Sequence, residues 1–305
     1  DYILGLTVVL ADGRVMRLGG KVIKNATGYN LMHALIGSEG TLGIVTEVIV
    51  RLIARPQVFR TAMATFARLD DAGTAVQRIL DTSVVPAVLE LMDRTTIKAV
   101  EDHMHLGLPV ESAAPLLIEV DGKTEEEVDR DILAVTDACR SAGATDVKLA
   151  HSTSEREALW EARRAVGPAT ARLAPNLLGE DISVPVATIP EAIRRIQQLP
   201  ERFGLPMVIY GHAGDGNLHP NVLFDRRDAS QTPIVEQMVG EIFRIAVDLG
   251  GTLSGEHGVG LTKQPYLAMA VDPVALDVMR AFKRILDPGC ILNPEKIFPC
   301  PAPSG

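Results

Sequence analysis

The sequence has few of the features that mark several common classes of protein. Its three cysteines, Cys139, Cys290 and Cys300, form no CxxC pair, which argues against a zinc knot, an iron–sulfur cluster or a thiol redox motif. We expect all three to be structural. No run approaches the roughly 18 apolar residues of a spanning helix, and Asp1-Tyr2-Ile3-Leu4 has no basic leader before an apolar core. We therefore expect a cytoplasmic protein, open to peripheral membrane association, that does not span the membrane.

Positive charge is also scarce. The chain has 30 Lys and Arg against 39 Asp and Glu, a net charge of −9. A phosphate backbone is bound by clustered basic residues, so this balance argues against a nucleic-acid partner. An acidic small molecule is not excluded, because its site needs only local positive charge. The 47% hydrophobic and 23% charged content is that of an ordinary globular protein.

The order of patterns along the chain predicts two domains of an α+β protein. Residues 3–10 and 15–18 read as a β-hairpin, a glycine-rich stretch covers 19–43, and a strand covers 44–53. Because Arg55-Pro56 interrupts the pattern, we predict one domain over 1–55 and another over 56–305. In the second, strand-like and helix-like segments alternate before a helical C-terminal part. The chain lacks an initiator Met and starts as a strand, so we expect it to begin inside a domain.

Two glycine-rich polar segments carry candidate metal ligands. GHAGDGNLHPN places His212 and His219 around a predicted hairpin turn, and SGEHGVG places Glu256 beside His257. Two imidazoles and one carboxylate with open positions suit a catalytic zinc, manganese or iron ion. The alternative is that the histidines only bond loop backbone. Neighbours on an extended segment diverge, so Glu256 can ligate the metal while His257 acts as general base.

Two further signals leave alternatives open. The loop IGSEGTLG at 36–43 matches neither a dinucleotide fingerprint nor a P-loop, and it reads equally as a tight turn. Arg163 follows Trp160 on a predicted helix. It either joins a solvated helix face with Glu157 or Glu161, or clamps a substrate carboxylate.

Taken together, these motifs resemble the FAD-linked oxidase family of the vanillyl-alcohol-oxidase-like superfamily, close to its D-lactate, glycolate and D-2-hydroxyglutarate dehydrogenases. Lys24-Asn25 to Gly28-Tyr29 and IGSEGTLG look like the late part of the FAD-binding domain of the PCMH type. GHAGDGNLHPN, SGEHGVG and DPGCILNPEKIF look like signatures of the substrate domain. The resemblance covers nearly the whole chain and implies an antiparallel substrate-domain sheet covered by helices, with a C-terminal part that returns to the flavin.

The resemblance also implies roles for individual residues. It implies a divalent metal on His212, His219 and Glu256, with His257 as base, and a substrate held by Arg163 and Asn221. Residues implied to contact FAD are Asn25, Gly28, Tyr29, Glu39, Gly40, Gly43, Ile44 and Asn293.

The implied reaction is FAD-dependent oxidation of a D-2-hydroxy acid, of the D-lactate or glycolate class, to the 2-oxo acid, with hydride transfer to flavin N5. Gly167 and Gly179 stand where the hydroxyglutarate enzymes hold a distal carboxylate, which disfavours a long dicarboxylate. The family's glycine-rich pyrophosphate segment does not precede Asp1, so we expect a fragment of a longer protein.

The partners and two rival functions remain open. The electron acceptor is open between an iron–sulfur subunit, an electron-transfer flavoprotein, a cytochrome and a quinone, and a homodimer is open as the oligomeric state. One rival function is a flavin-free metal-binding or regulatory module of the same fold. The other is a metal-free alcohol or aldehyde oxidase of the wider superfamily.

Overall fold

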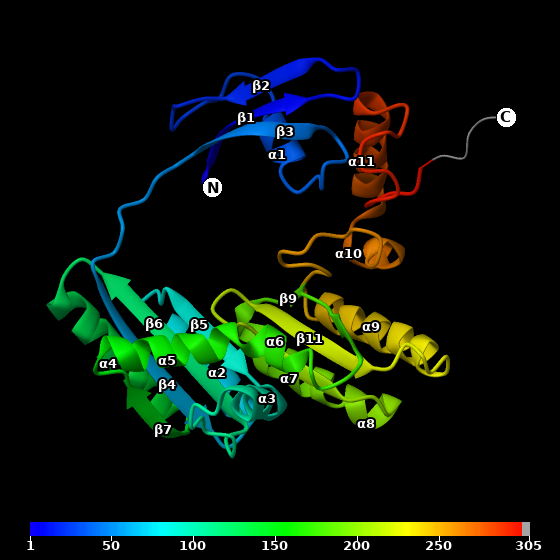
Figure 1. The fold of residues 1–305 in the computed structure, drawn as a ribbon. Helices are drawn as coiled ribbons and strands as arrows, with labels where there is room; N and C mark the ends of the chain where they lie inside the picture. Colours follow the sequence, from blue (N-terminus) through cyan, green and yellow to red (C-terminus); the bar gives the residue numbers. More distant parts are fainter. Residues whose placement is uncertain (301–305) are drawn as a thin grey trace. The chain divides into compact units, whose positions relative to one another are not determined.

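The computed structural model describes residues 1–300, and the chain divides into two compact units (Figure 1). One unit combines residues 1–55 with those from Glu256 onward, and the other comprises residues 56–255. In the described part of the chain, no helix combines the length and the apolar character needed to cross a membrane.

The unit formed by residues 56–255 is built on one antiparallel sheet. The strands lie in the order β7-β4-β6-β5-β10-β11-β8, and β9 also pairs with β11. The predicted α+β class with an antiparallel substrate-domain sheet is therefore confirmed. The strands are β4 (Val58–Phe66), β5 (Val88–Met92), β6 (Ala114–Gly122), β7 (Ala144–Leu149), β8 (Asn176–Gly179), β9 (Ile182–Ser183), β10 (Met207–His212) and β11 (Asn217–Phe224).

The helices of this unit form two packed groups (Figure 1). In one, neighbours touch in the order α4-α2-α7-α9, with α8 beside α7 and α9. In the other, α3, α5 and α6 share an apolar cluster with Met92 and pack against Tyr210. The helices are α2 (Leu69–Leu80), α3 (Arg94–Met104), α4 (Glu125–Ser141), α5 (Thr153–Arg164), α6 (Val166–Thr170), α7 (Ile189–Gln197), α8 (Leu199–Phe203) and α9 (Gln231–Asp248), with the 3-10 turn η1 (Val186–Thr188) before α7.

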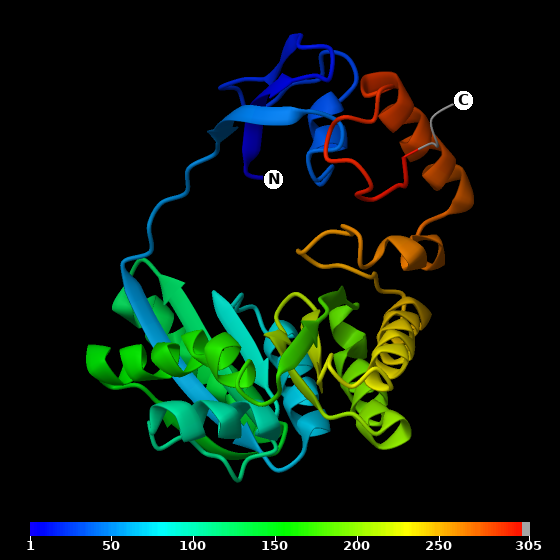
Figure 2. The ribbon, with the colours of Figure 1, turned by 45° about the vertical axis from the view of Figure 1, so that its right-hand side comes forward.

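The other unit contains a three-stranded antiparallel sheet in the order β2-β1-β3, with α1 packed near it (Figure 2). Its small core gathers Leu6, Val8 and Leu35. Its elements are β1 (Ile3–Val9), β2 (Val15–Gly19), α1 (Leu31–Leu35), β3 (Ile44–Val50), η2 (Gln264–Tyr266), α10 (Leu267–Ala270) and α11 (Pro273–Leu286). Asp272 caps α11, accepting from the backbone N–H groups of Val274 and Ala275, with Pro273 in the first turn.

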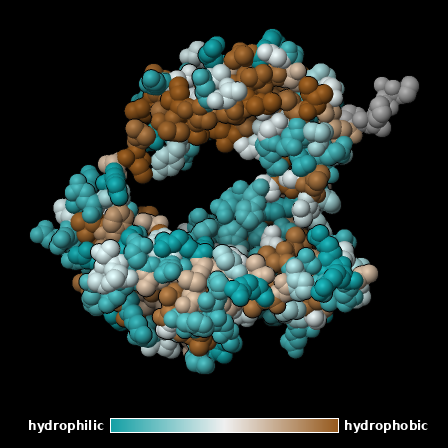
Figure 3. Space-filling model, viewed as in Figure 1, coloured by the Kyte–Doolittle hydropathy of each residue, from teal (hydrophilic) through white to brown (hydrophobic). Residues whose placement is uncertain are grey.

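Apolar side chains are exposed over this three-stranded sheet, and Figure 3 shows them as a brown area on the β1–β3 part of the chain. On β3, Ile44, Val45, Val48 and Val50 are each about half exposed or slightly less. A strand that is apolar on both faces is typical of one that is buried on both. The composition of β3 is therefore that of a strand covered on each side.

Candidate active site

The hairpin of β10 and β11 carries a polar face inside the sheet. In β11, Asn217, His219 and Asn221 alternate with apolar neighbours and are all buried. Because alternate residues of a strand point to one face, these three share a face. Tyr210 lies opposite His219 in the register, so it shares that face as well. The polar side chains of an antiparallel strand normally face water. A buried row of polar side chains therefore indicates a site.

His212 and His219 come together on this face. Their rings meet edge to face, with centroids 5.3 Å apart, and one ring nitrogen of each lies within 4.8 Å of the other. His212 ends β10, whereas His219 is the third residue of β11 and 6% exposed. The expectation that both histidines lie at the hairpin mouth and are not buried along an apolar strand is therefore wrong for His219, which is buried within β11.

Two glycines allow the hairpin to close. A Cβ on Gly211 would lie 2.4 Å from the backbone oxygen of Asn217 across the strand pair. Gly216 has φ of +84°, and its Cβ would lie 2.0 Å from the backbone oxygen of Val184. A side chain at Gly211 would force β10 and β11 apart, whereas one at Gly216 would clash with the backbone that follows β9. Gly211 therefore sets the spacing of the strands that carry the two histidines.

Arg163 reaches the same face from the end of α5. Its side chain is 18% exposed, and its Nε donates to Oε2 of Glu90 at 2.9 Å. Its guanidinium also lies 5.9 Å from the Tyr210 ring centroid. The reading of Arg163 as part of a solvated helix face is therefore wrong, because it pairs with a buried strand residue and not with Glu157 or Glu161.

Asn221 is fixed from two directions. Its Nδ2 donates to the backbone oxygen of His219 at 2.6 Å, and its Oδ1 lies where a side chain at Gly179 would stand, 2.4 Å from an ideal Cβ. Burial raises the pKa of the Tyr210 hydroxyl, although the nearby side chains of Asn221 and Thr170 act in the opposite direction. Asn221 is therefore fixed between the His219 backbone and Gly179, beside Tyr210.

Glu256 follows directly on a segment anchored to β9. Ser183 and Thr252 form a bridge, Asp181 accepts from the Gly255 backbone N–H at 2.9 Å, and the Ser254 hydroxyl bonds the Asp181 carboxylate. A Cβ on Gly255 would lie 2.6 Å from the Asn217 amide. Only glycine fits there, so the backbone that leads into Glu256 is held against the hairpin.

In the other unit, Glu39 joins three segments. Its carboxylate accepts from the backbone N–H groups of Val259 at 2.6 Å and Gly260 at 2.9 Å, two and three residues after His257. Asn293 donates from Nδ2 to the Glu39 backbone oxygen at 2.5 Å. Both Glu39 and Asn293 have positive φ, at 52° and 38°. Backbone in this region clusters at functional positions, so the fold strains the chain at two residues predicted to contact FAD.

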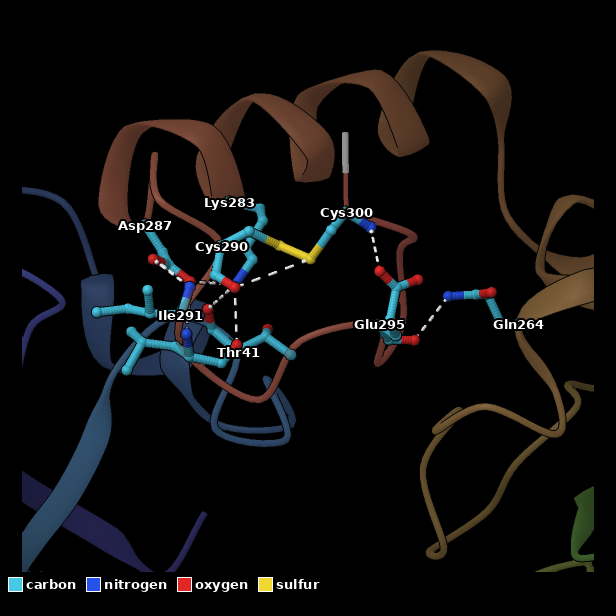
Figure 4. The surroundings of a disulfide bond; sticks show 9 residues. Thr41, Gln264, Lys283, Asp287, Cys290, Ile291, Glu295 and Cys300 are labelled. Carbon is cyan, nitrogen blue, oxygen red and sulfur yellow. Dashed lines mark hydrogen bonds and ion pairs between the residues drawn. A yellow bond between two sulfur atoms is a disulfide. The ribbon is translucent and has the colours of Figure 1, made fainter. Parts of the chain in front are cut away.

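The loop that bears Asn293 is fastened at several points (Figure 4). Cys290 and Cys300 form a disulfide across it. Lys283 of α11 donates from Nζ to the backbone oxygens of Thr41 at 2.8 Å and Leu292 at 3.0 Å. Cys139, by contrast, is buried, and burial raises the pKa of its thiol to about 12. The sequence did not indicate this disulfide, because its spacing matches no motif.

The other predicted FAD residues lie in the same unit. Asn25 accepts from the backbone N–H of Thr27, Tyr29 is 96% exposed, and Ile44 begins β3. Gly28 and Gly40 have positive φ and open space where a side chain would stand. At Gly43 a Cβ would lie 2.4 Å from Cγ1 of Val8 in β1, so that glycine serves strand packing.

Glu90 is the site residue that the sequence did not reveal. It lies within the apolar strand β5 and is only 7% exposed. Its Oε1 bonds Nδ1 of His212. Burial alone raises the pKa of the Glu90 carboxyl, but the His212 bond and the Arg163 charge outweigh burial and lower it. The available signal was a lone carboxylate in an apolar strand, which is rarely buried unless paired.

Comparison with known proteins matches residues 55–297 to the family described as FAD linked oxidases, C-terminal domain. A glycolate oxidase subunit GlcD from Bacillus subtilis is 43% identical over 298 residues, covering 98% of this chain and 63% of that protein. A D-lactate dehydrogenase from Anaerostipes hadrus is 33% identical over 306 residues, covering 97% of this chain and 64% of that protein. The chain thus spans less than two thirds of the length of these relatives.

Solved structures are similar at lower identity. p-Cresol methylhydroxylase with substrate bound superimposes with a TM-score of 0.75 at 18% identity, over 97% of this chain and 65% of that one. An alkyldihydroxyacetonephosphate synthase gives a TM-score of 0.64 at 20% identity, over 97% of this chain and 54% of that one. At these identities the likeness establishes a shared fold.

Proposed function

Since the chain belongs to the FAD linked oxidases through their C-terminal domain, we propose that it is the substrate-binding part of a flavoenzyme that oxidises a D-2-hydroxy acid of the D-lactate or glycolate class to the 2-oxo acid. The relatives named above are a glycolate oxidase subunit and a D-lactate dehydrogenase. The observation that carries the proposal is the buried polar face on which Arg163 and Glu90 adjoin the His212–His219 pair.

The donor set fits a divalent zinc, manganese or iron ion. His212 and His219 would supply two nitrogens, and Glu256, one peptide bond beyond the anchored Gly255, would supply a carboxylate oxygen. Such a set leaves positions open for substrate. A bound cation would make the substrate hydroxyl more acidic.

The unit that contains Glu39 and Asn293 would contact FAD through its backbone. Gly28 and Gly40 leave their backbones accessible, and the chain has positive φ at Glu39, directly before Gly40. Bound FAD would supply the two-electron acceptor for the oxidation.

The protein's own residues would bind the acid and move one proton. Arg163 would hold the substrate carboxylate, with Asn221 beside it. His257, whose Nε2 lies 3.8 Å from the Glu256 carboxylate, would accept the hydroxyl proton as the Cα hydride leaves. The alcohol then loses one proton and one hydride, which balances its oxidation to the 2-oxo acid.

The structure also bears on substrate size. Gly167 has open space beside its backbone, so no side chain stands there to hold a distal carboxylate. At Gly179 the Asn221 amide fills the place of a side chain. Both features support a short hydroxy acid over D-2-hydroxyglutarate.

Metal content, measured by mass spectrometry on purified protein, gives the first test. We expect about one divalent metal per chain, lost in His212→Ala and kept in His151→Ala, which removes an exposed histidine of the same unit. Metal in His212→Ala equal to that of the wild type would refute the assigned ligands.

The second test is to mix flavin-loaded protein anaerobically with D-lactate, L-lactate, glycolate and D-2-hydroxyglutarate. D-lactate or glycolate should bleach the flavin absorbance fastest. His257→Ala should slow bleaching about 10²- to 10⁴-fold and leave metal content unchanged. Bound metal with no bleaching by any acid would instead support the flavin-free metal-binding or regulatory module.

A further inference from the structure

Glu90 lies opposite His212 in the sheet. The register of β5 and β10 pairs these two residues directly, and directly paired side chains in an antiparallel sheet project to the same face. The remaining residues of β5 are Val88, Leu89, Leu91 and Met92. A carboxylate in this apolar strand, 7% exposed, must lose most of its hydration. Its partners therefore have to replace that hydration.

The two oxygens of Glu90 serve two different partners. Oε1 bonds Nδ1 of His212, and Oε2 accepts from Nε of Arg163 at 2.9 Å. The partners come from different elements, His212 from β10 and Arg163 from α5. One carboxylate thus connects a candidate metal ligand with the candidate binder of the substrate carboxylate.

The bond to His212 selects the ring nitrogen available to a metal. A carboxylate accepts hydrogen bonds, so Nδ1 carries the proton and the lone pair lies on Nε2. Metal-binding histidines commonly donate their second ring N–H to a carboxylate in this way, and loss of that partner weakens metal binding about 10- to 100-fold.

The bond to Arg163 uses only its Nε. Among residues 1–300, no protein group bonds the two terminal amino groups of this guanidinium. These amino groups form the fork that matches a carboxylate in a bidentate pair. Glu90 thereby restrains the guanidinium and leaves its binding end available.

We propose that Glu90 is a positioning residue: its carboxylate sets Nε2 of His212 as the metal-binding atom and orients Arg163 toward the substrate carboxylate. The proposal deepens the proposed function and rests on it for the roles of His212 and Arg163. It goes beyond that function because one buried side chain then affects two affinities, that for the metal and that for the substrate. Replacing Glu90 should weaken both affinities, whereas replacing Arg163 should weaken only the affinity for the substrate.

The tautomer of His212 tests the first half of the proposal, the role of Glu90 toward His212, without any metal or flavin. In ¹⁵N imidazole spectra of the metal-free protein, assigned with His212→Ala, we expect the proton on Nδ1. A proton on Nε2 would overturn the proposal. This measurement stands even if no hydroxy acid is oxidised, so its failure and that of the proposed function are distinguishable.

Titration with zinc alone tests whether Glu90 strengthens metal binding through His212. Glu90→Gln should raise the zinc Kd about 10- to 100-fold, while Arg163→Gln should leave it within twofold. Glu119→Gln is the matched control, because Glu119 is also a buried sheet carboxylate paired with an arginine, but it does not contact His212. An unchanged Kd in Glu90→Gln, or an equal loss in Glu119→Gln, would contradict the proposal.

Steady-state kinetics test the second half of the proposal, that Glu90 orients Arg163 toward the substrate carboxylate. Both Glu90→Gln and Arg163→Gln should raise KM for the short hydroxy acid, and the zinc-saturated Glu90→Gln protein should retain that rise. A KM in zinc-saturated Glu90→Gln equal to that of the wild type would show that Glu90 does not orient Arg163.

Discussion

Replacing Glu119 by alanine should destabilise the unit of residues 56–255 strongly. Glu119 lies on β6, is 3% exposed, and accepts hydrogen bonds from three side chains. Thr61 donates at 2.6 Å, Trp160 donates from its indole at 2.8 Å, and Arg156 donates from Nε and Nη2 at 2.8 Å each. Alanine would remove all four bonds and leave these donors facing an apolar methyl group.

The decrease in the free energy of unfolding follows from the ion pair between Glu119 and Arg156. Breaking a buried pair by removing one partner costs about 3 to 5 kcal/mol, because the other charge is left without compensation. The Arg156 side chain is 28% exposed and can regain some water, so we expect the lower end, about 3 kcal/mol. With a urea slope of roughly 2 to 3 kcal/mol per M for a unit of this size, the unfolding midpoint should fall by about 1 to 1.5 M.

Trp160 gives the assay, because it is the only tryptophan in the sequence and its indole bonds Glu119. Its fluorescence therefore reports on this unit during urea unfolding. Glu126→Ala, which removes an exposed carboxylate of α4, is the control and should shift the midpoint by less than about 0.3 M. A shift equally small in Glu119→Ala would refute the reasoning that the cluster stabilises the sheet.

Two predictions concern the loop after α11, and both can be read by hydrogen exchange. The pKa of Asp287 is lowered: burial raises it, but Lys283 and the backbone N–H groups of Ile291 and Leu292 outweigh burial. Its stabilisation is therefore present above the unfolded pKa of about 4 and lost as pH falls through the folded value. After correction for the intrinsic rate, protection of those two amides should drop at acid pH in the wild type and already be low at neutral pH in Asp287→Asn. Cys300→Ser opens a disulfide of sequence separation 10, which should destabilise the loop by roughly 3 kcal/mol in the chain-entropy model; exchange over 287–300 equal to that of the oxidised wild type would contradict this.

The sequence predicted the hairpin of the site because its signals are local. Glycines mark the turn, and the alternation of β11 follows directly from a period of two. The antiparallel α+β class was likewise predicted and is confirmed. The expectation failed for His219 because burial depends on what packs over the strand: His219 lies in β11 and is buried, whereas the sequence placed it at the hairpin mouth.

The partners of Arg163 and His212 could not be predicted, because they depend on strand pairing across long sequence distances. Glu90 lies 73 residues from Arg163 and 122 from His212. Nothing local distinguishes a helical arginine that pairs within its helix from one that pairs with a strand. The Cys290–Cys300 disulfide had the same difficulty, since it closes an irregular loop in which Cys290 itself has positive φ.

Two buried arginine–glutamate pairs under α5 show why composition alone does not separate structural from functional residues. Arg156 and Arg163 are seven residues apart, so they share one face of the helix, and they reach Glu119 and Glu90 on the neighbouring strands β6 and β5. All three guanidinium nitrogens of Arg156 have partners, since its Nη1 bonds Glu157. Arg163 is bonded only through Nε within the described chain. A pair in which every guanidinium nitrogen is bonded stabilises the fold, whereas Arg163 keeps two amino groups with which to bind a ligand. This difference in hydrogen bonding is why we propose Arg163 and Glu90, and not Arg156 and Glu119, as site residues.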